Sequence, residues 1–233
     1  SRKKRRQKVT KFLDADMDFK PEKLTYMGDH LEGHPFAENS FISYPDEEIL
    51  IMHEWESFLM KAHADFVCEI GGDILEFGFG MGISANFIQE HNPKSHTIIE
   101  IHPQVIEKAK EWAADKPNVT IVEGNWIDVL PTLTEGTVKT TAKKFDGVFY
   151  DIISTPYLSD QHSKFPDLII PHLKPKTRIS HWNPVQEENC SACGFMNHPK
   201  FNITFDKIPV DVNSQPEPYK FVDFYYMPKV FLK

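Results

Sequence analysis

The stretch DILEFGFGMG, residues 73–82, decides the fold of this chain. An apolar run, DILEF, leads into glycines that alternate with larger residues. Residues 83–91 then continue with a helical pattern. An apolar run that ends in glycines and opens a helix predicts a strand, a tight loop and a helix.

The chain beyond this unit goes on alternating strands and helices. Strands are predicted over 96–101, 119–123, 145–151 and 177–181, with helices over 103–114, near 126–133 and in a stretch that ends in residues 173–175. Residues 201–210 and 219–232 are rich in β-branched and aromatic residues and predict a C-terminal antiparallel hairpin. The whole pattern predicts an α/β fold with a doubly wound, mainly parallel seven-stranded sheet.

The segment before residue 73 divides into two parts. Residues 12–45 are polar and irregular, which predicts a lid or arm. Residues 49–67 are amphipathic and follow an acidic turn, so we interpret them as a helix that precedes the sheet. We therefore expect a basic arm and lid over residues 1–45 and one domain over residues 46–233.

Charge is distributed unevenly along the chain. The net charge of -8 argues against a protein whose whole surface binds nucleic acid. Residues 2–6, RKKRR, with Lys8 and Lys11 form a cationic arm that either contacts a polyanion, serves as a nuclear-import signal or is a solvated tail. No apolar run approaches the roughly 20 residues that cross a bilayer. We expect an intracellular protein without a membrane partner, cytoplasmic or, through the basic run, nuclear.

Cysteine usage predicts neither disulfides nor a metal site. Cys68, Cys190 and Cys193 make an odd count, as is usual in a reducing compartment. Cys190 and Cys193 have the spacing of half a zinc site, with His181 and His198 nearby in the sequence. A second ligand pair of standard spacing is missing, so we predict that no metal is bound.

The glycine loop, residues 78–82, is the first candidate ligand site. Ligands of open α/β sheets bind beyond the carboxyl ends of the strands, and a glycine-rich turn into a helix offers N–H groups and positive potential. Dinucleotide-binding domains use the same device, so a nicotinamide cofactor is an alternative. Glu100 ends the next strand, where an acidic group can accept hydrogen bonds from ribose hydroxyls of either cofactor.

Four further residues favour S-adenosylmethionine. Asn125 and Trp126 follow the third strand, where an aromatic plane and a polar group could meet adenine. Trp126 read by itself could equally be a core aromatic. Together with Glu76 before the loop and Asp151 after the fourth strand, the pattern favours a methyl donor over a nicotinamide.

At this point the motifs resemble a known family. EFGFGM (76–81), IIE (98–100), GNWIDVLPTL (124–133) and FDGVFYD (145–151) look like the successive motifs of guanidinoacetate N-methyltransferase. The related arginine δ-N-methyltransferases of fungi and plants share much of this pattern. The resemblance runs from about residue 51 to residue 173. It implies a Rossmann-like methyltransferase fold and guanidino N-methylation.

The resemblance and the loop pattern together give a set of cofactor positions. MHEWE, residues 52–56, resembles the family segment in which a Met and a Trp-Glu pair precede the loop, so Met52 is expected to touch the cofactor. The expected cofactor contacts are Met52, Glu76, Gly78, Gly80, Met81, Gly82, Glu100, Ile101, Asn125, Trp126 and Asp151.

The resemblance also assigns the acceptor site. Glu56 would grip the guanidino group, with Asp151 as its partner carboxylate. A guanidinium has a pKa above about 12, so it is charged at neutral pH and is a poor nucleophile. Two carboxylates that hold its planar fork and accept its proton therefore have a chemical purpose. Without the resemblance, Glu56 is by default a solvated helix residue and Asp151 a loop cap.

The sequence departs from the family after Asp151. The family continues with Thr-Tyr-Pro-Leu, whereas this chain has IISTPYL over residues 152–158, in the loop expected to line the acceptor pocket. Alternatives are therefore methylation of another amine, a hydroxyl or a nucleic-acid base, or a scaffold without activity. His162, His172 and His181 are candidate bases for another acceptor, and each is also a candidate for an ordinary polar contact.

Overall fold

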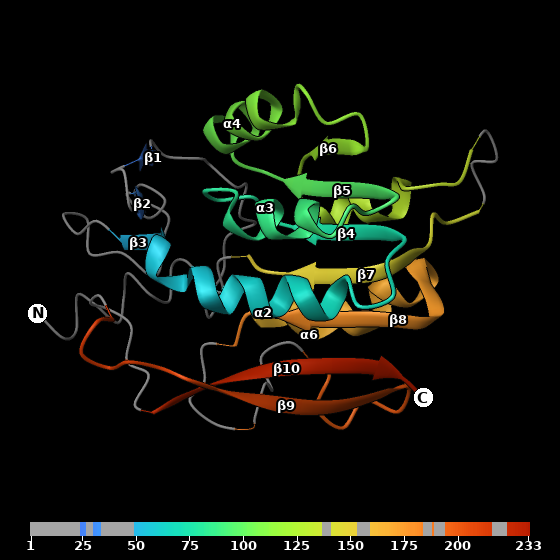
Figure 1. Ribbon diagram of the computed structural model, residues 1–233. Helices are drawn as coiled ribbons and strands as arrows, with labels where there is room; N and C mark the ends of the chain where they lie inside the picture. The colour runs from blue at the N-terminus through green and yellow to red at the C-terminus, as the bar shows by residue number, and fades with distance from the viewer. Residues whose placement is uncertain are drawn as a thin grey trace, which may run out of the picture.

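A computed structural model describes residues 24–26, 30–33, 49–136, 141–152, 159–183, 188, 194–215 and 223–233. Its main element is a seven-stranded sheet in the order β6-β5-β4-β7-β8-β10-β9 (Figure 1). The strands are β4 (Asp73–Phe77), β5 (Ser95–Glu100), β6 (Val119–Glu123), β7 (Phe145–Tyr150), β8 (Leu173–His181), β9 (Phe201–Pro209) and β10 (Phe224–Leu232).

The sheet is parallel from β6 to β8 and antiparallel at the C-terminal strands. β4 pairs in parallel with β5 and β7, and the outer pairs β5–β6 and β7–β8 are also parallel. β10 pairs antiparallel with both β8 and β9. The predicted seven-stranded, mainly parallel sheet with a C-terminal hairpin is confirmed, and the parallel strands all end at one edge, on the left in Figure 1.

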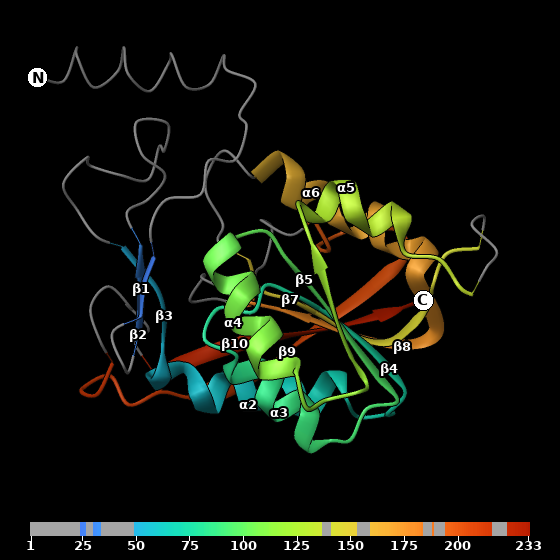
Figure 2. The same cartoon turned by 90° about the horizontal axis from the view of Figure 1, so that it is seen from above.

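Helices cover both faces of the sheet (Figure 2). One face carries α2 (Ser57–Val67), α3 (Ile83–Glu90) and α4 (Pro103–Ala113), and the other carries α5 (Trp126–Val129) and α6 (Ser159–Ile169). Three short 3-10 helices, η2 (Glu54–Glu56), η3 (Leu130–Thr132) and η4 (Ile170–His172), join these elements.

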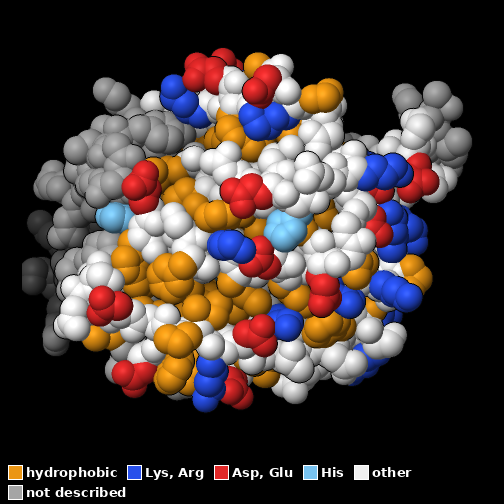
Figure 3. Space-filling view, viewed as in Figure 1, with side chains coloured by type: hydrophobic (Ala, Val, Ile, Leu, Met, Phe, Trp, Pro, Cys, Tyr) orange, Lys and Arg blue, Asp and Glu red, His pale blue; other side chains and the backbone are white. Residues whose placement is uncertain are grey.

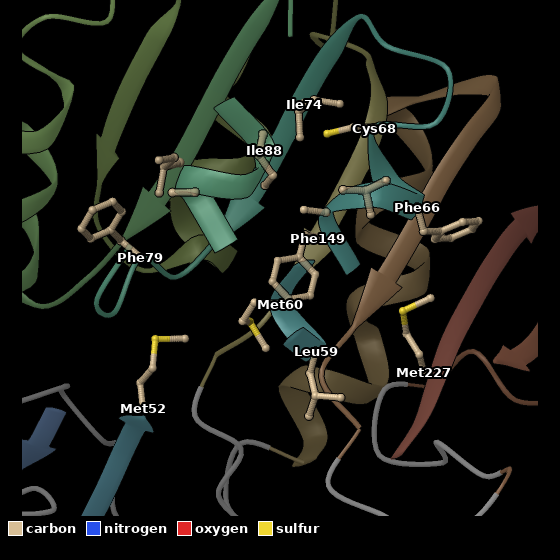
Figure 4. Close-up of a cluster of buried hydrophobic side chains, with 14 of the residues drawn as sticks. Met52, Leu59, Met60, Phe66, Cys68, Ile74, Phe79, Ile88, Phe149 and Met227 are labelled. Carbon is tan, nitrogen blue, oxygen red and sulfur yellow. The ribbon is translucent and has the colours of Figure 1, made fainter. Parts of the chain in front are cut away.

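Alternation along the strands supplies a core to each face. Ile74 and Phe149 pack with Leu59 and Met60 on the α2 side, as Figure 4 shows. Leu75, Phe77 and Val148 face the α6 side, where Phe165 joins them. Because successive strand residues point to opposite faces, a strand buried between two helical layers needs apolar residues on both sides.

The outer surface of the α2 side is mixed in character (Figure 3). Apolar side chains gather over α2 and the β9–β10 hairpin between scattered charges. Phe58 and Phe224 are among the large apolar side chains that are exposed. In the described part of the chain, no helix is long and apolar enough to cross a membrane.

The predicted helix over residues 49–67 is only partly correct. Residues 49–53 form a strand, β3 (Ile49–His53), and the helix α2 begins at Ser57. β3 pairs antiparallel with β2 (His30–Gly33), which pairs with β1 (Leu24–Tyr26), giving a second sheet of three strands. The run ILIM is apolar throughout, so its pattern is compatible with a helix or with a strand. Backbone pairing with β2 makes it a strand.

Two further features of the secondary structure differ from the prediction. The lid segment predicted to be irregular contains β1 and β2, which pair with each other and, through β2, with β3. The helix before the fifth strand ends at Ile169, and β8 begins at Leu173 rather than at residue 177. The earlier start of β8 goes with an irregularity in its register with β7, where Phe145 pairs with Leu173 but Gly147 pairs with Arg178. The hydroxyl of Thr177 donates to Phe145 O at 2.7 Å and keeps β8 attached to β7 past Pro175.

Candidate active site

The glycine loop is shaped by close backbone approaches. Gly78 has φ +85°, and a Cβ added there would lie 2.3 Å from the carbonyl oxygen of Asp151. Gly80 has φ +54°, and a Cβ there would lie 2.9 Å from Sδ of Met52. Both positions have a left-handed backbone, which favours glycine, and at Gly78 the close neighbour is also backbone, so only glycine fits there. Gly82 is the N-cap of α3.

Glu100 ties this loop to the end of β5. Its Oε2 accepts a hydrogen bond from the N–H of Phe79 at 2.8 Å, and its Oε1 accepts from the N–H groups of Ile101 and His102 at 2.8 and 2.9 Å. Ile101 therefore contributes its backbone to the same cluster. A carboxylate offers about four acceptor positions, so three bonds leave room for one more donor.

Met52 reaches the loop from β3. Its Sδ accepts a hydrogen bond from the N–H of Met81 at 3.4 Å, and its side chain is buried. Figure 4 shows Met52 at the end of its strand, directed toward the loop that carries Phe79. The structure thus brings Met52, Gly80 and Met81 together, although about thirty residues of sequence separate Met52 from the loop.

Glu76 lies beneath the loop rather than on it. Its carboxylate is fully buried, accepts a short hydrogen bond from the hydroxyl of Ser84, and lies 2.8 Å from Nε2 of His96. Nδ1 of His96 in turn contacts Gln89 of α3 at 3.1 Å. These contacts fasten the first turn of α3 to β4 and β5, so Glu76 supports the loop from below.

Asn125 and Trp126 also have structural partners. Asn125 caps α5 by accepting the N–H of Ile127 at 3.3 Å. Trp126 is 5% exposed and makes edge contacts with the rings of Phe77, Tyr150 and Phe165. The indole is thus largely enclosed in the core, and little of its surface is left for a ligand.

Glu56 and Asp151 come together at the carboxyl end of the sheet. Glu56 ends η2 and is buried, and its Oε1 accepts the N–H of His53 at 3.4 Å. Burial and, next, the negative charge of Asp151 raise the pKa of Glu56 well above its ordinary value. Burial and the charge of Glu76 raise the pKa of Asp151 to about 7. A cation placed between these two carboxyl groups would favour the ionised form of both.

His53 is a supporting residue that sequence reasoning missed. Its Nδ1 accepts the N–H of Trp55 at 2.9 Å, while the side chain of Glu56 bonds back to the N–H of His53. This reciprocal arrangement is a capping box, and it fixes the orientation of Glu56. The signal was a polar residue three positions before a glutamate, with histidine in place of the usual serine or threonine.

The three candidate histidine bases are interior residues. His181 donates from Nδ1 to Trp182 O at 2.8 Å, and Nδ1 of His162 lies 2.6 Å from the hydroxyl of Tyr150. Burial lowers the pKa of each of these two to about 4. His172 bonds to Lys143 O, and burial lowers its pKa. The structure therefore favours ordinary polar contacts over catalytic bases for all three.

The described residues contain no group of three or more His, Cys, Asp or Glu side chains arranged for a metal ion. Cys68 is a buried free thiol. Cys190 and Cys193, the half zinc site, lie outside the described residues, as do Lys8, Lys11 and the basic run over 2–6.

Comparison with known proteins identifies relatives of this site. The model of the guanidinoacetate N-methyltransferase family matches residues 46–174. A protein arginine N-methyltransferase 2 from Candida glabrata is 37% identical over 68% of this chain and 37% of its own length. The protein of the same name from Saccharomyces cerevisiae is 32% identical over 61% of this chain and 36% of its own length. The chain thus spans little more than a third of these curated relatives.

Solved structures share the fold at low sequence identity. An O-methyltransferase from Bacillus cereus in complex with S-adenosylhomocysteine (SAH) has a TM-score of 0.51 at 15% identity, covering 76% of this chain and 78% of that one. A precorrin-6y C5,15-methyltransferase from Geobacter metallireducens has a TM-score of 0.53 at 12% identity, covering 78% and 90%. These likenesses confirm the methyltransferase type of sheet.

Proposed function

Because this chain belongs to the guanidinoacetate N-methyltransferase family, we propose that it transfers a methyl group from S-adenosylmethionine to a nitrogen of a guanidino-type acceptor. The resemblance predicted from the motifs is confirmed by that membership. The observation that carries the proposal is the pairing of Glu56 and Asp151, two carboxylates from distant parts of the sequence, at the strand end beside the glycine loop.

The residues around the loop suit S-adenosylmethionine as the methyl donor. Glycines at 78 and 80 let the loop lie close against Asp151 and Met52, and Glu100 keeps acceptor capacity for a ribose hydroxyl. The N-terminus of α3 offers N–H donors for a carboxylate. We assign direct contact to Met52, Gly78, Gly80, Met81, Gly82, Glu100 and Ile101, and supporting roles to Glu76, Asn125 and Trp126.

Glu56 and Asp151 have a defined task toward the acceptor. Their carboxylates hold the planar guanidinium by charge-assisted hydrogen bonds and aim one nitrogen at the sulfonium methyl. A nitrogen–carbon bond forms as the sulfur–carbon bond breaks, and the nitrogen loses one proton, which a carboxylate accepts. Asp151, with a pKa of about 7 in the free protein, suits proton uptake near neutral pH.

We propose an arginine side chain or a small guanidino compound as the acceptor. Relatives named protein arginine N-methyltransferase 2 support the first, and the family name supports the second. A mass-spectrometric screen would incubate the protein with S-adenosylmethionine and guanidinoacetate, free arginine or arginine-containing proteins. We expect the mass of one methyl group on a guanidino acceptor, and no such product with Glu56→Gln. Methylation of only hydroxyl or nucleic-acid acceptors would overturn the proposal.

We also propose that the basic run over residues 2–6 contacts a polyanion such as RNA. Its support is the local excess of positive charge on an otherwise acidic chain. RNA binding that weakens steeply with salt in the full chain, and is lost when residues 1–11 are removed, is the expected result. Equal binding by both forms would refute it.

A further inference from the structure

Trp182 lies next to Asp151 at the end of the sheet. Tyr150 of β7 is paired in register with His181 of β8, and the N–H of Trp182 donates to Tyr150 O at 3.1 Å. The next position along each strand is Asp151 on β7 and Trp182 on β8. The last backbone bond between the two strands therefore brings these two residues side by side.

Side-chain alternation places both residues on the α2 side. On β8, Ser180 bonds to His63 of α2, His181 stacks on Phe195 of the opposite face, and Trp182 returns to the α2 side to stack on Tyr225.

The strand β7 follows the same alternation. Phe149 contacts His63, and Tyr150 stacks on Phe165 of α6, so Asp151 points back toward α2. Glu56, at the start of α2, completes the same corner.

A buried chain of hydrogen bonds holds this aromatic pair in place. The hydroxyl of Ser180 donates to Pro228 O at 2.6 Å, so Nδ1–H of His63 must donate to Ser180 Oγ at 2.7 Å. The other ring nitrogen of His63 then accepts the hydroxyl of Tyr225 at 2.9 Å. Tyr225 Oη also accepts the N–H of Asn183 at 2.9 Å. The ring of Tyr225, and the indole stacked on it, are thereby fixed relative to α2.

We propose that Trp182 determines acceptor specificity: its indole forms the wall on which a planar guanidinium stacks while Glu56 and Asp151 bind its edge. The inference rests on the proposed function and adds a residue to it. Carboxylates recognise the charge and hydrogen-bonding edge of a guanidinium, and an aromatic face recognises its flat surface. Trp182 and Tyr225 stack with centroids 5.1 Å apart and 30° between planes, so the wall is a rigid two-ring layer.

The test measures binding of guanidino ligands and their uncharged urea counterparts to the SAH-loaded protein. The probes are guanidinoacetate, L-arginine and a Gly-Arg-Gly peptide, with hydantoic acid, L-citrulline and the citrulline peptide as partners. Trp182→Leu is expected to weaken the guanidino ligands by about tenfold, with little change for the urea partners, and Trp182→Phe to keep most of the affinity. Phe224→Leu, an exposed aromatic next to Tyr225, is the matched control.

The possible results distinguish a failure of the role of Trp182 from a failure of the proposed function. Unchanged SAH affinity and melting temperature in Trp182→Leu establish that the variant is folded. Guanidino binding equal to that of the wild type in this variant would overturn the role of Trp182 and leave the proposed function standing. If the SAH-loaded wild type binds none of the three guanidino probes, the proposed function fails and the inference fails with it.

Discussion

The N–H of Phe79 donates to Oε2 of Glu100 at 2.8 Å, so one carboxylate at the end of β5 fixes the backbone of the glycine loop that follows β4. Glu100 also binds the two N–H groups that open the next helix. Replacing it therefore affects the shape of the cofactor site as well as any direct contact.

Glu100→Ala is expected to weaken SAH binding by about tenfold or more, because three N–H groups, two of them in buried hydrogen bonds, lose their acceptor. Isothermal titration with SAH measures the change. Glu123→Ala, at the exposed end of the neighbouring strand β6, is the control and should bind SAH like the wild type. Equal affinities in all three proteins would contradict the role of Glu100.

Glu56→Gln and Asp151→Asn should leave SAH affinity nearly intact and reduce turnover by about two orders of magnitude or more. Each removes one of the two carboxylates proposed to hold the acceptor, while keeping the shape of the side chain. Initial rates at saturating S-adenosylmethionine test this, with Glu54→Gln on the exposed side of η2 as the control. Full activity in both variants would contradict the assignment of Glu56 and Asp151 as catalytic residues.

The pH dependence of stability should reveal the raised pKa of Asp151. Its value of about 7 lies above the roughly 3.9 of an unfolded chain, so folding favours the protonated form. The stabilising contribution is complete below about pH 4 and is lost as pH rises through 7. Asp151→Asn should therefore melt about 3 °C or more above the wild type at pH 8, with the gap closing toward pH 4. A gap that is constant with pH would count against this account.

Gly78→Ala should damage the fold more than an alanine at another glycine of positive φ. The new Cβ would lie 2.3 Å from Asp151 O, so the backbone of residue 78 or of Asp151 must move. This displacement adds to the strain of a left-handed conformation at an alanine. Gly136 has φ +56° with nothing within 4 Å of the added Cβ, and its alanine variant isolates the strain, about 1 kcal/mol. Thermal melts should show a clearly larger loss for Gly78→Ala; similar losses would mean that the close approach is unimportant.

Glu76→Gln separates support of the loop from contact with the cofactor. The carboxylate is buried against Ser84 and His96, so the variant should lower the free energy of unfolding by about 1–3 kcal/mol. Urea unfolding and SAH titration are compared on the same protein. A large loss of SAH affinity without a loss of stability would indicate that Glu76 contacts the cofactor directly.

The sequence was most informative where periodicity and glycine placement act together. DILEF followed by alternating glycines specifies a strand and turn locally, and the later strands share that local signal, so the sheet was predictable. Residues 49–53 were not, because ILIM becomes a strand only by pairing with β2, a partner distant in sequence.

In the candidate site, too, contacts between residues distant in the sequence could not be predicted from local patterns. Glu56 and Asp151 were predicted as a pair through the family resemblance, since the 94 residues between them carry no local signal that they meet. For Glu76 the pattern marks an acidic residue before the loop, but it does not show the Ser84 and His96 that bind its carboxylate. Trp182 was missed because its importance comes from the β7–β8 register, which no single stretch of sequence displays.

The strand order has a consequence for how the chain acquires its structure during synthesis. β4 to β8 can assemble in the order in which they leave the ribosome, but β9 is attached to the sheet only through β10, which follows it in the sequence. Until β10 arrives, the edge of β8 is open and Tyr225 cannot bond to His63. The ring of Tyr225 that stacks on Trp182 therefore joins the corner formed by Glu56, Asp151 and Trp182 only after β10 has been synthesised.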